Sequence, residues 1–137
     1  MNKHPYLRAY LAGIAVPTVF LLVIMAGYTV LRHVYDFPVP IERFIVFPMA
    51  AVPNAWGLWN VLYVACLARR HFSLGLFGGA LPLLLAPSGY FVGQLLEFPV
   101  PHVVFHVAPF ALPIGFVVYY LVWKYFVGFL NAELGIA

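Results

Sequence analysis

Charged residues are scarce in this chain. Only 8% of its 137 residues are Asp, Glu, Lys or Arg, whereas about a quarter of the residues of a typical soluble domain are charged. Hydrophobic residues make up 65% of the chain, and the mean hydropathy is +0.99. This composition excludes a water-soluble globule and indicates an integral membrane protein.

Cysteine is nearly absent, and so are the motifs of several enzyme classes. Cys66 is the only cysteine, so the chain can form neither an internal disulfide nor a thiol pair. Ser88 and His106 offer a nucleophile and a base, but no Gly-x-Ser-x-Gly motif or phosphate-binding loop accompanies them. The formal net charge of +3 is spread over the ends of the apolar stretches. These absences favour a non-catalytic protein, without excluding an enzyme, and argue against a nucleic-acid partner.

Four long apolar stretches follow one another along the chain. They cover about residues 9–31, 44–68, 72–96 and 103–123, and a helix that crosses a membrane needs roughly 20 mostly apolar residues. The first stretch is longer than the core of a signal peptide and lacks a clear cleavage site, so we expect it to be retained. The sequence therefore predicts an all-α integral membrane protein with four transmembrane helices.

Lysine and arginine lie unevenly around these stretches. Lys3 and Arg8 precede the first, Arg69 and Arg70 separate the second from the third, and Lys124 follows the fourth. With four spans, these five residues fall on the same side of the membrane, whereas Arg32 and Arg43 fall on the other. Because Lys and Arg are enriched in cytoplasmic segments, we predict that both termini are cytoplasmic and that the two loops between paired helices face the outside.

Each of those outer loops carries nearly the same five residues. Residues 36–40 read Asp-Phe-Pro-Val-Pro, and residues 97–101, 61 positions later, read Glu-Phe-Pro-Val-Pro. Further matches extend to residues 50 and 111. The pattern predicts two tandem two-helix repeats, residues 1–68 and 69–137, within a single membrane domain. A two-helix unit returns the chain to its starting side, so the copies should be related by a pseudo-twofold axis along the membrane normal.

Prolines and glycines interrupt the predicted spans. Prolines occur inside all four of them, at positions 17, 48, 53, 82, 87, 109 and 113, and an internal proline removes a hydrogen bond and kinks a helix. Gly75, Gly79, Gly89 and Gly93 recur at helical spacing on one face of the third span. Such a face lets helices approach closely, so we predict Pro-kinked helices that pack around the third span.

Histidines distinguish the second repeat from the first. His102 and His106 stand where the first repeat has Ile41 and Ile45, one helical turn apart, a spacing with which two histidines can bind one metal ion. His33 is a candidate third ligand, and histidines from two helices can also hold haem. Alternatively, the side chain of His106 bonds a carbonyl freed by a nearby proline.

Acidic residues are predicted to lie at the same outer end of the bundle. Asp36, Glu42 and Glu97, together with His106, are candidates for ligand binding or for a proton relay. No substrate or cofactor is identified by these residues alone.

Three functions are compatible with the sequence. The leading hypothesis is a non-catalytic accessory or assembly subunit that packs within the membrane against a larger complex. The second is a small-solute or ion transporter or channel that acts as a homo-oligomer. The third is a haem- or metal-binding membrane protein that uses His102 and His106. The expected partners are the lipid bilayer and other copies or other chains of a membrane complex.

Overall fold

All of the regular structure in the described residues is helical. The computed structural model describes residues 3–36, 41–67, 70–95, 97 and 102–136, and residues 41–49 by their backbone alone. The elements are α1 (Pro5–Tyr35), α2 (Ile41–Leu62), the π-helical turn η1 (Tyr63–Leu67), α3 (Leu74–Gly79), α4 (Leu81–Leu95), α5 (Val103–Val122), the π-helical turn η3 (Trp123–Val127) and α6 (Gly128–Glu133). Four helical segments are long and apolar enough to cross a membrane. The predicted all-α class and the four apolar spans are confirmed.

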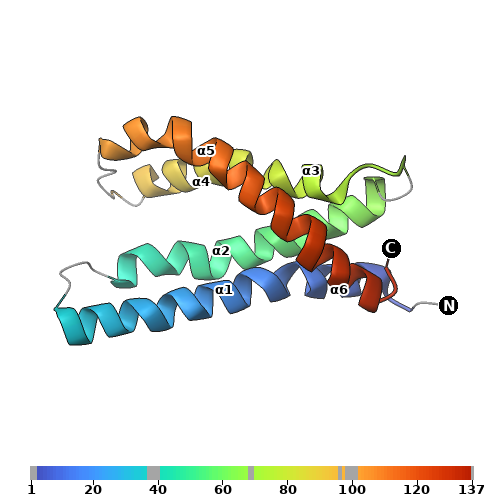
Figure 1. Cartoon of the computed structure of the whole chain (residues 1–137), viewed down its shortest axis with the longest axis horizontal. Helices are drawn as coiled ribbons and strands as arrows, with labels where there is room; N and C mark the ends of the chain where they lie inside the picture. The colour runs from blue at the N-terminus through green and yellow to red at the C-terminus, as the bar shows by residue number, and fades with distance from the viewer. Residues whose placement is uncertain (1–2, 37–40, 68–69, 96, 98–101, 137) are drawn as a thin grey trace.

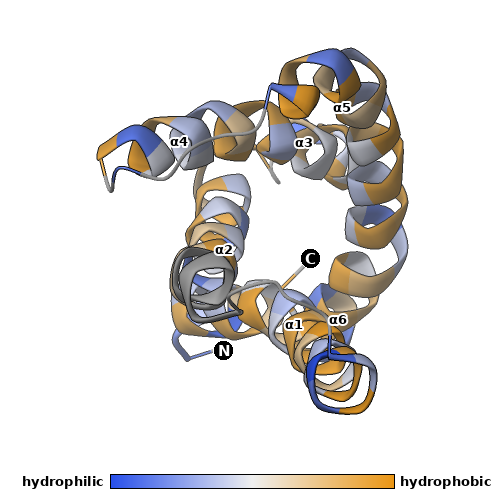
Figure 2. Ribbon diagram, turned by 90° about the vertical axis from the view of Figure 1, so that its left-hand side faces the viewer, coloured by the Kyte–Doolittle hydropathy of each residue, from blue (hydrophilic) through white to orange (hydrophobic). Residues whose placement is uncertain are grey.

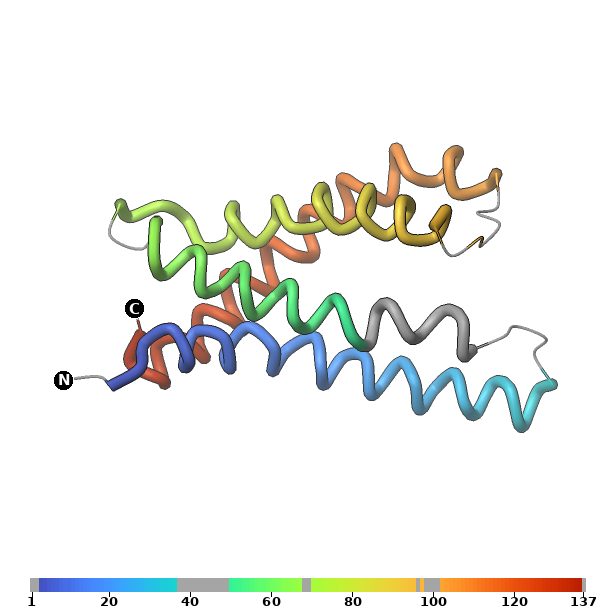
Figure 3. The backbone as a smooth tube through the Cα atoms, turned by 180° about the vertical axis from the view of Figure 1, so that it is seen from behind, coloured from blue at the N-terminus to red at the C-terminus, as the bar shows by residue number. Residues whose placement is uncertain are grey.

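The helices form two antiparallel pairs that the last helix joins. α1 lies beside α2, and α5 starts beside α4 and crosses obliquely, so that α6 lies next to α1 (Figure 1). The same crossing is visible along the bundle in Figure 2 and from behind in Figure 3. We call the end that holds both termini the termini end. The other end, which holds Asp36, Glu97 and His102, is the hairpin end.

The helix ends follow ordinary capping chemistry with some unusual backbone angles. Pro5 occupies the first turn of α1, where the missing amide proton is not needed. Asp36 follows the last residue of α1 and has a φ of 49°, and Glu97 follows α4 and has a φ of 56°. The backbone of both acidic residues is therefore in the left-handed region. Their N–H groups donate to the carbonyl oxygens of Leu31 and Gln94. Left-handed backbone is uncommon outside glycine and ends a helix by turning the chain away.

The third span is interrupted. α3 ends at Gly79, Ala80 forms a turn, and α4 starts at Leu81. Pro82 is the second residue of α4, a position near a helix start that tolerates proline. Elsewhere, Pro17, Pro87, Pro109 and Pro113 lie inside helices.

The fourth helical segment is longer than the sequence predicts. It continues past Trp123 through η3 and α6 and ends at Glu133, because Lys124 does not break a helix. The end is formed by Gly135 at φ 65°, with the N–H of Ile136 donating to the carbonyl oxygen of Asn131 over 2.8 Å. A glycine in left-handed conformation after the last turn is a common helix stop.

A small aromatic core lies in the termini half of the bundle. Trp56, Leu81, Trp123 and Val127 form the buried cluster, and they come from α2, α4 and η3. The centroid of the Trp56 ring lies 5.2 Å from that of the Trp123 ring and 4.9 Å from that of the Tyr119 ring. Burying large aromatic rings together is a strong source of packing energy. This cluster joins the two helix pairs.

Candidate functional site

The predicted ligand residues at the hairpin end do not form a cluster in the described structure. His33 and Asp36 lie at the end of α1, and Glu97, His102 and His106 lie where α4 is followed by α5; all five are exposed. The hairpin end of α1 stands apart from the pair formed by α4 and α5 (Figure 2). Among the described residues, no three His, Cys, Asp or Glu side chains lie close enough to hold a metal ion. Glu42 is on α2, and its side chain lies outside the described residues.

The glycines of the third span sit against α5 and η3. Gly75 is buried beside Tyr120, and Gly79 is buried beside Phe116; an added Cβ would lie 2.8 Å and 3.0 Å from the two rings, respectively. Gly89 and Gly93 lie farther along, on α4, and are half-buried. The predicted packing face therefore splits between a tight half on α3 and a looser half on α4.

Gly78 makes the tightest of these approaches, although the sequence pattern does not single it out. A Cβ on Gly78 would lie 1.9 Å from Cγ of Trp123, far inside the sum of the atomic radii. Gly78 is adjacent to Gly79 and off the regular spacing of the predicted face. The Gly-Gly pair is the signal that identifies it, because two adjacent small residues leave room for a large ring.

Two buried asparagines link three helices at the termini end. Asn60 of α2 donates from Nδ2 to the side-chain oxygen of Asn131 on α6, at 2.8 Å, and to the backbone oxygen of Ala9 on α1, also at 2.8 Å. Asn131 donates back to the side-chain oxygen of Asn60 at 3.1 Å. Both side chains are fully buried. Paired amides satisfy each other's polar groups where no water is available, so this pair fastens α6 onto the first helix pair.

Other polar side chains bond backbone or nearby helices. Trp59 donates from Nε1 to the carbonyl oxygen of Phe77 over 2.8 Å, and Tyr63 donates to that of Phe72 over 2.7 Å. Ser88 donates to the carbonyl oxygen of Leu84, one turn back in its own helix. That bond is the ordinary behaviour of a serine in a membrane helix, and it does not prepare Ser88 to act as a nucleophile.

An apolar pocket of about 170 Å³ lies between α1, α2 and α5. It is lined by aliphatic side chains from all three helices and by the rings of Phe20, Trp56 and Tyr119. Trp56 is 4% exposed, and no hydrogen bond partners its Nε1–H among the described residues. Such a surface can receive hydrocarbon, but it has few groups with which to hold an ion or a hydrophilic solute.

A second apolar pocket, of about 400 Å³, adjoins the first along α1. It lies between α1 and the continuous helical segment of α5, η3 and α6 (Val103–Glu133), which we call the crossing helix. It shares Val16, Phe20 and Val122 with the first pocket. Its remaining lining is Ala15, Val19, Phe126 and Leu130. We call the two pockets together the α1 groove. Its lining is suited to an apolar chain or to an apolar helix.

The rest of the candidate surface belongs to α5. No described residue from Val103 to Val122 is buried, and Phe110 and Ile114 are 73% and 64% exposed. At the hairpin end, the contact of α5 with α4 includes the ring of Phe105, edge-on to that of Tyr90 at 5.6 Å. The face of α5 that carries Phe110 and Ile114, by contrast, is largely exposed in the described structure.

Comparison with known proteins identifies no family for this chain. The sequence matches no protein-family model and no curated protein, and no solved structure matches it. Its function is therefore inferred from its own residues.

Proposed function

We propose that this protein is a non-catalytic membrane subunit whose α5 packs within the bilayer against helices of another membrane chain. The observation that carries the proposal is the absence of any buried residue in α5. A helix in a four-helix bundle ordinarily turns part of its surface inward. Here no residue in the most apolar window of the fourth span is fully buried inside the chain. The side chains that α5 packs against its neighbours, such as Phe116 and Tyr119, are only half-buried.

The residues on α5 are not those of a purely lipid-facing helix. Pro109 and Pro113 lie inside it, and each removes the hydrogen bond that would end on the carbonyl four residues earlier. His106 adds an exposed polar ring. Freed carbonyls and polar side chains are costly in hydrocarbon unless protein or water satisfies them. A partner helix against this face would supply that environment.

The same geometry favours a subunit over a transporter of polar solutes. Both described pockets between the helices have apolar linings, whereas a solute path near the membrane midplane needs polar or charged groups. The alternative function is a homo-oligomeric transporter. In that case, the exposed face of α5 would pack against a second copy of the same chain. Haem or metal binding through His102 and His106 stays a prediction.

The proposal includes the two tandem two-helix repeats, residues 1–68 and 69–137. Two backbone features support it. Asp36 and Glu97 both have a positive φ, and π-helical turns occur at residues 63–67 and 123–127. The matched sequence positions are 61 residues apart, and the turns recur 60 residues apart. π-helical turns are rare, so their recurrence at this spacing is expected of two copies of one unit.

Photo-crosslinking in native membranes tests the proposal. A photoreactive benzoyl-phenylalanine at Phe110 should give a protein adduct, and mass spectrometry should identify the adduct as one defined membrane chain. The matched control is the same group at Val23 of α1, which is 66% exposed and is expected to label lipid. An adduct with a second copy of this chain would favour the homo-oligomer instead. If neither position gave a protein adduct, α5 would face lipid and the proposal would be wrong.

A further inference from the structure

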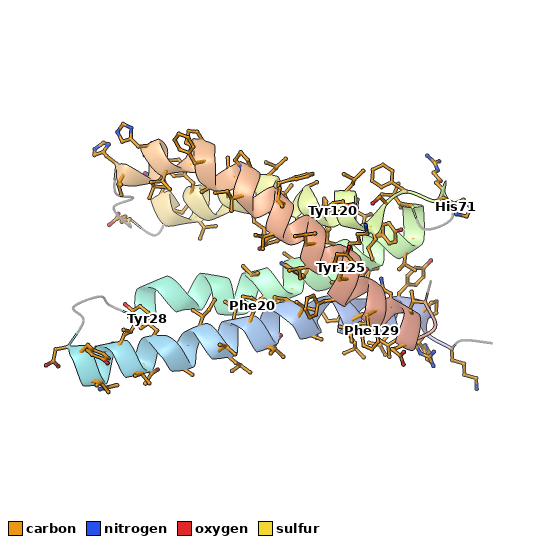
Figure 4. All side chains as sticks on the ribbon, viewed as in Figure 1. Phe20, Tyr28, His71, Tyr120, Tyr125 and Phe129 are labelled. Atoms are coloured by element: carbon orange, nitrogen blue, oxygen red, sulfur yellow. The ribbon has the colours of Figure 1, made fainter. Side chains whose placement is uncertain are left out.

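The α1 groove has a definite direction. It extends along α1 from Leu130 of the crossing helix, near the termini end, to Ile24 toward the hairpin end. Its lining is almost entirely hydrocarbon, and the termini-end part is the larger. Figure 4 labels Phe20, which lines both parts of the groove.

A cation stands at the termini end of this groove. Arg8 lies 7 and 11 residues before the lining residues Ala15 and Val19, a spacing that places it on the same face of α1. Its Nη1 donates to the carbonyl oxygen of Leu134 over 3.1 Å, one turn beyond Leu130. A carbonyl is neutral, so this bond positions the guanidinium without neutralising it. An arginine has five N–H donors, and this bond takes one of them.

We propose that the α1 groove binds one anionic phospholipid, with the phosphate at Arg8 and an acyl chain between α1 and the crossing helix. The positive charge of Arg8 lies at one end of the groove, and the apolar lining extends away from it. A phospholipid has the same order, with a charged headgroup followed by apolar tails. Lys3, exposed at the start of the chain, adds a second cation near that end. The exposed carboxylate of Glu133, next to Leu134 in the chain, offsets part of this positive charge. Basic groups at the interface between transmembrane helices are how proteins select acidic lipids, and guanidinium groups bind phosphate with directed hydrogen bonds.

Native mass spectrometry of the delipidated full chain tests this site. The protein in detergent is titrated with phosphatidylglycerol or with phosphatidylcholine of the same acyl chains. One phosphatidylglycerol should bind at least tenfold more tightly than phosphatidylcholine. Arg8→Gln should lower the affinity for phosphatidylglycerol about tenfold and should leave the affinity for phosphatidylcholine nearly unchanged.

Two matched pairs of variants separate the site from general effects. Val19→Trp fills the groove from an exposed position and should abolish tight binding, whereas Val23→Trp, one turn along and outside the lining, should not. Lys124→Gln removes another exposed cation, beside the rings of Tyr120 and Tyr125 (Figure 4), and should also leave binding intact. Circular dichroism and gel filtration confirm that each variant folds.

Two outcomes would overturn the proposal. Equal retention of both lipids would show that the groove does not recognise the headgroup charge. Unchanged binding in Val19→Trp would place the lipid elsewhere. If Arg8→Gln failed to fold, the Val19→Trp and Val23→Trp pair would still decide, because both positions are exposed on α1 and do not contribute to the buried core.

Discussion

The two ends of this bundle are packed in different ways. At the termini end, Gly78 meets Trp123, Asn60 pairs with Asn131, and a buried aromatic cluster joins both helix pairs. At the hairpin end, the described helices are largely exposed, and α1 stands apart from α4 and α5 (Figure 2). The hairpin end also carries large apolar side chains, such as Val34, Leu95 and Val103, and they are exposed. A lack of apolar residues therefore does not explain the difference.

Small and amide side chains do explain it. In a membrane, lipid tails are as apolar as leucine, so helices associate where backbones can approach closely or where polar groups pair. The termini end has such residues at matched depths: Gly13 of α1 faces the backbone of Gly57 on α2, and Gly75, Gly78 and Gly79 face aromatic rings. The comparison predicts that stability resides at the termini end, and that the hairpin end is left for partners.

The largest effect should come from Gly78→Ala. The added Cβ would lie 1.9 Å from Cγ of the fully buried Trp123, so α3 and the crossing helix must separate. We expect the free energy of unfolding in detergent to fall by roughly 3 kcal/mol or more.

The control for Gly78→Ala is Gly27→Ala, because no atom lies within 4 Å of a Cβ added there. Alanine is the better helix former, so this change should raise the free energy of unfolding by up to about 1 kcal/mol. Equal effects of the two substitutions, measured by denaturant titration, would show that the close approach at Gly78 does not stabilise the protein.

The next largest effect should come from the buried amides. Asn131→Leu leaves the side chain of Asn60 with one hydrogen bond to Ala9 and without its reciprocal partner. An unsatisfied buried polar group costs about 1–3 kcal/mol, so the single variant should lose that much stability. The double variant Asn60→Leu/Asn131→Leu should recover part of the loss. Additive losses in this double-mutant cycle would mean that the two amides do not depend on each other.

A smaller effect is expected at the hairpin end. Tyr90 and Phe105 are 43% and 52% exposed, and their rings meet edge-on with the centroids 5.6 Å apart. Replacing Phe105 by alanine should lower the free energy of unfolding by about 0.5–1.5 kcal/mol, the usual range for an aromatic pair. A loss as large as that of Gly78→Ala would show that the hairpin end is as important for stability as the termini end.

The sequence predicts the fold class well because the lengths of apolar runs determine it. Four runs of about 20 residues require four helices, and these are observed. The glycine spacing also identifies Gly75 and Gly79, but it does not name the rings that cover them. That pairing depends on the oblique crossing of α5 over α3, which a one-dimensional pattern does not contain.

The contacts between distant segments were beyond sequence reasoning for the same reason. Asn60 and Asn131 are 71 residues apart, and the second of them lies past the predicted end of the fourth span. The α1 groove likewise exists only where the last helix returns to α1. The described residues contain no group of three metal-binding side chains, so His33 does not join His102 and His106 there. Metal or haem binding by His102 and His106 stays a prediction.

The smallest effect on stability should come from the histidines of α5. His102 and His106 are exposed, so His102→Ala/His106→Ala should change the free energy of unfolding by less than about 0.5 kcal/mol, as is usual for surface substitutions. The same variant tests the cofactor hypothesis when metal analysis and an absorption spectrum are recorded on both purified proteins. A stoichiometric metal or a haem band that the variant lacks would assign the ligands and give the hairpin end a binding role of its own. Colourless, metal-free protein would leave the exposed face of α5 as a packing surface, and the crosslink from Phe110 would then identify what covers it.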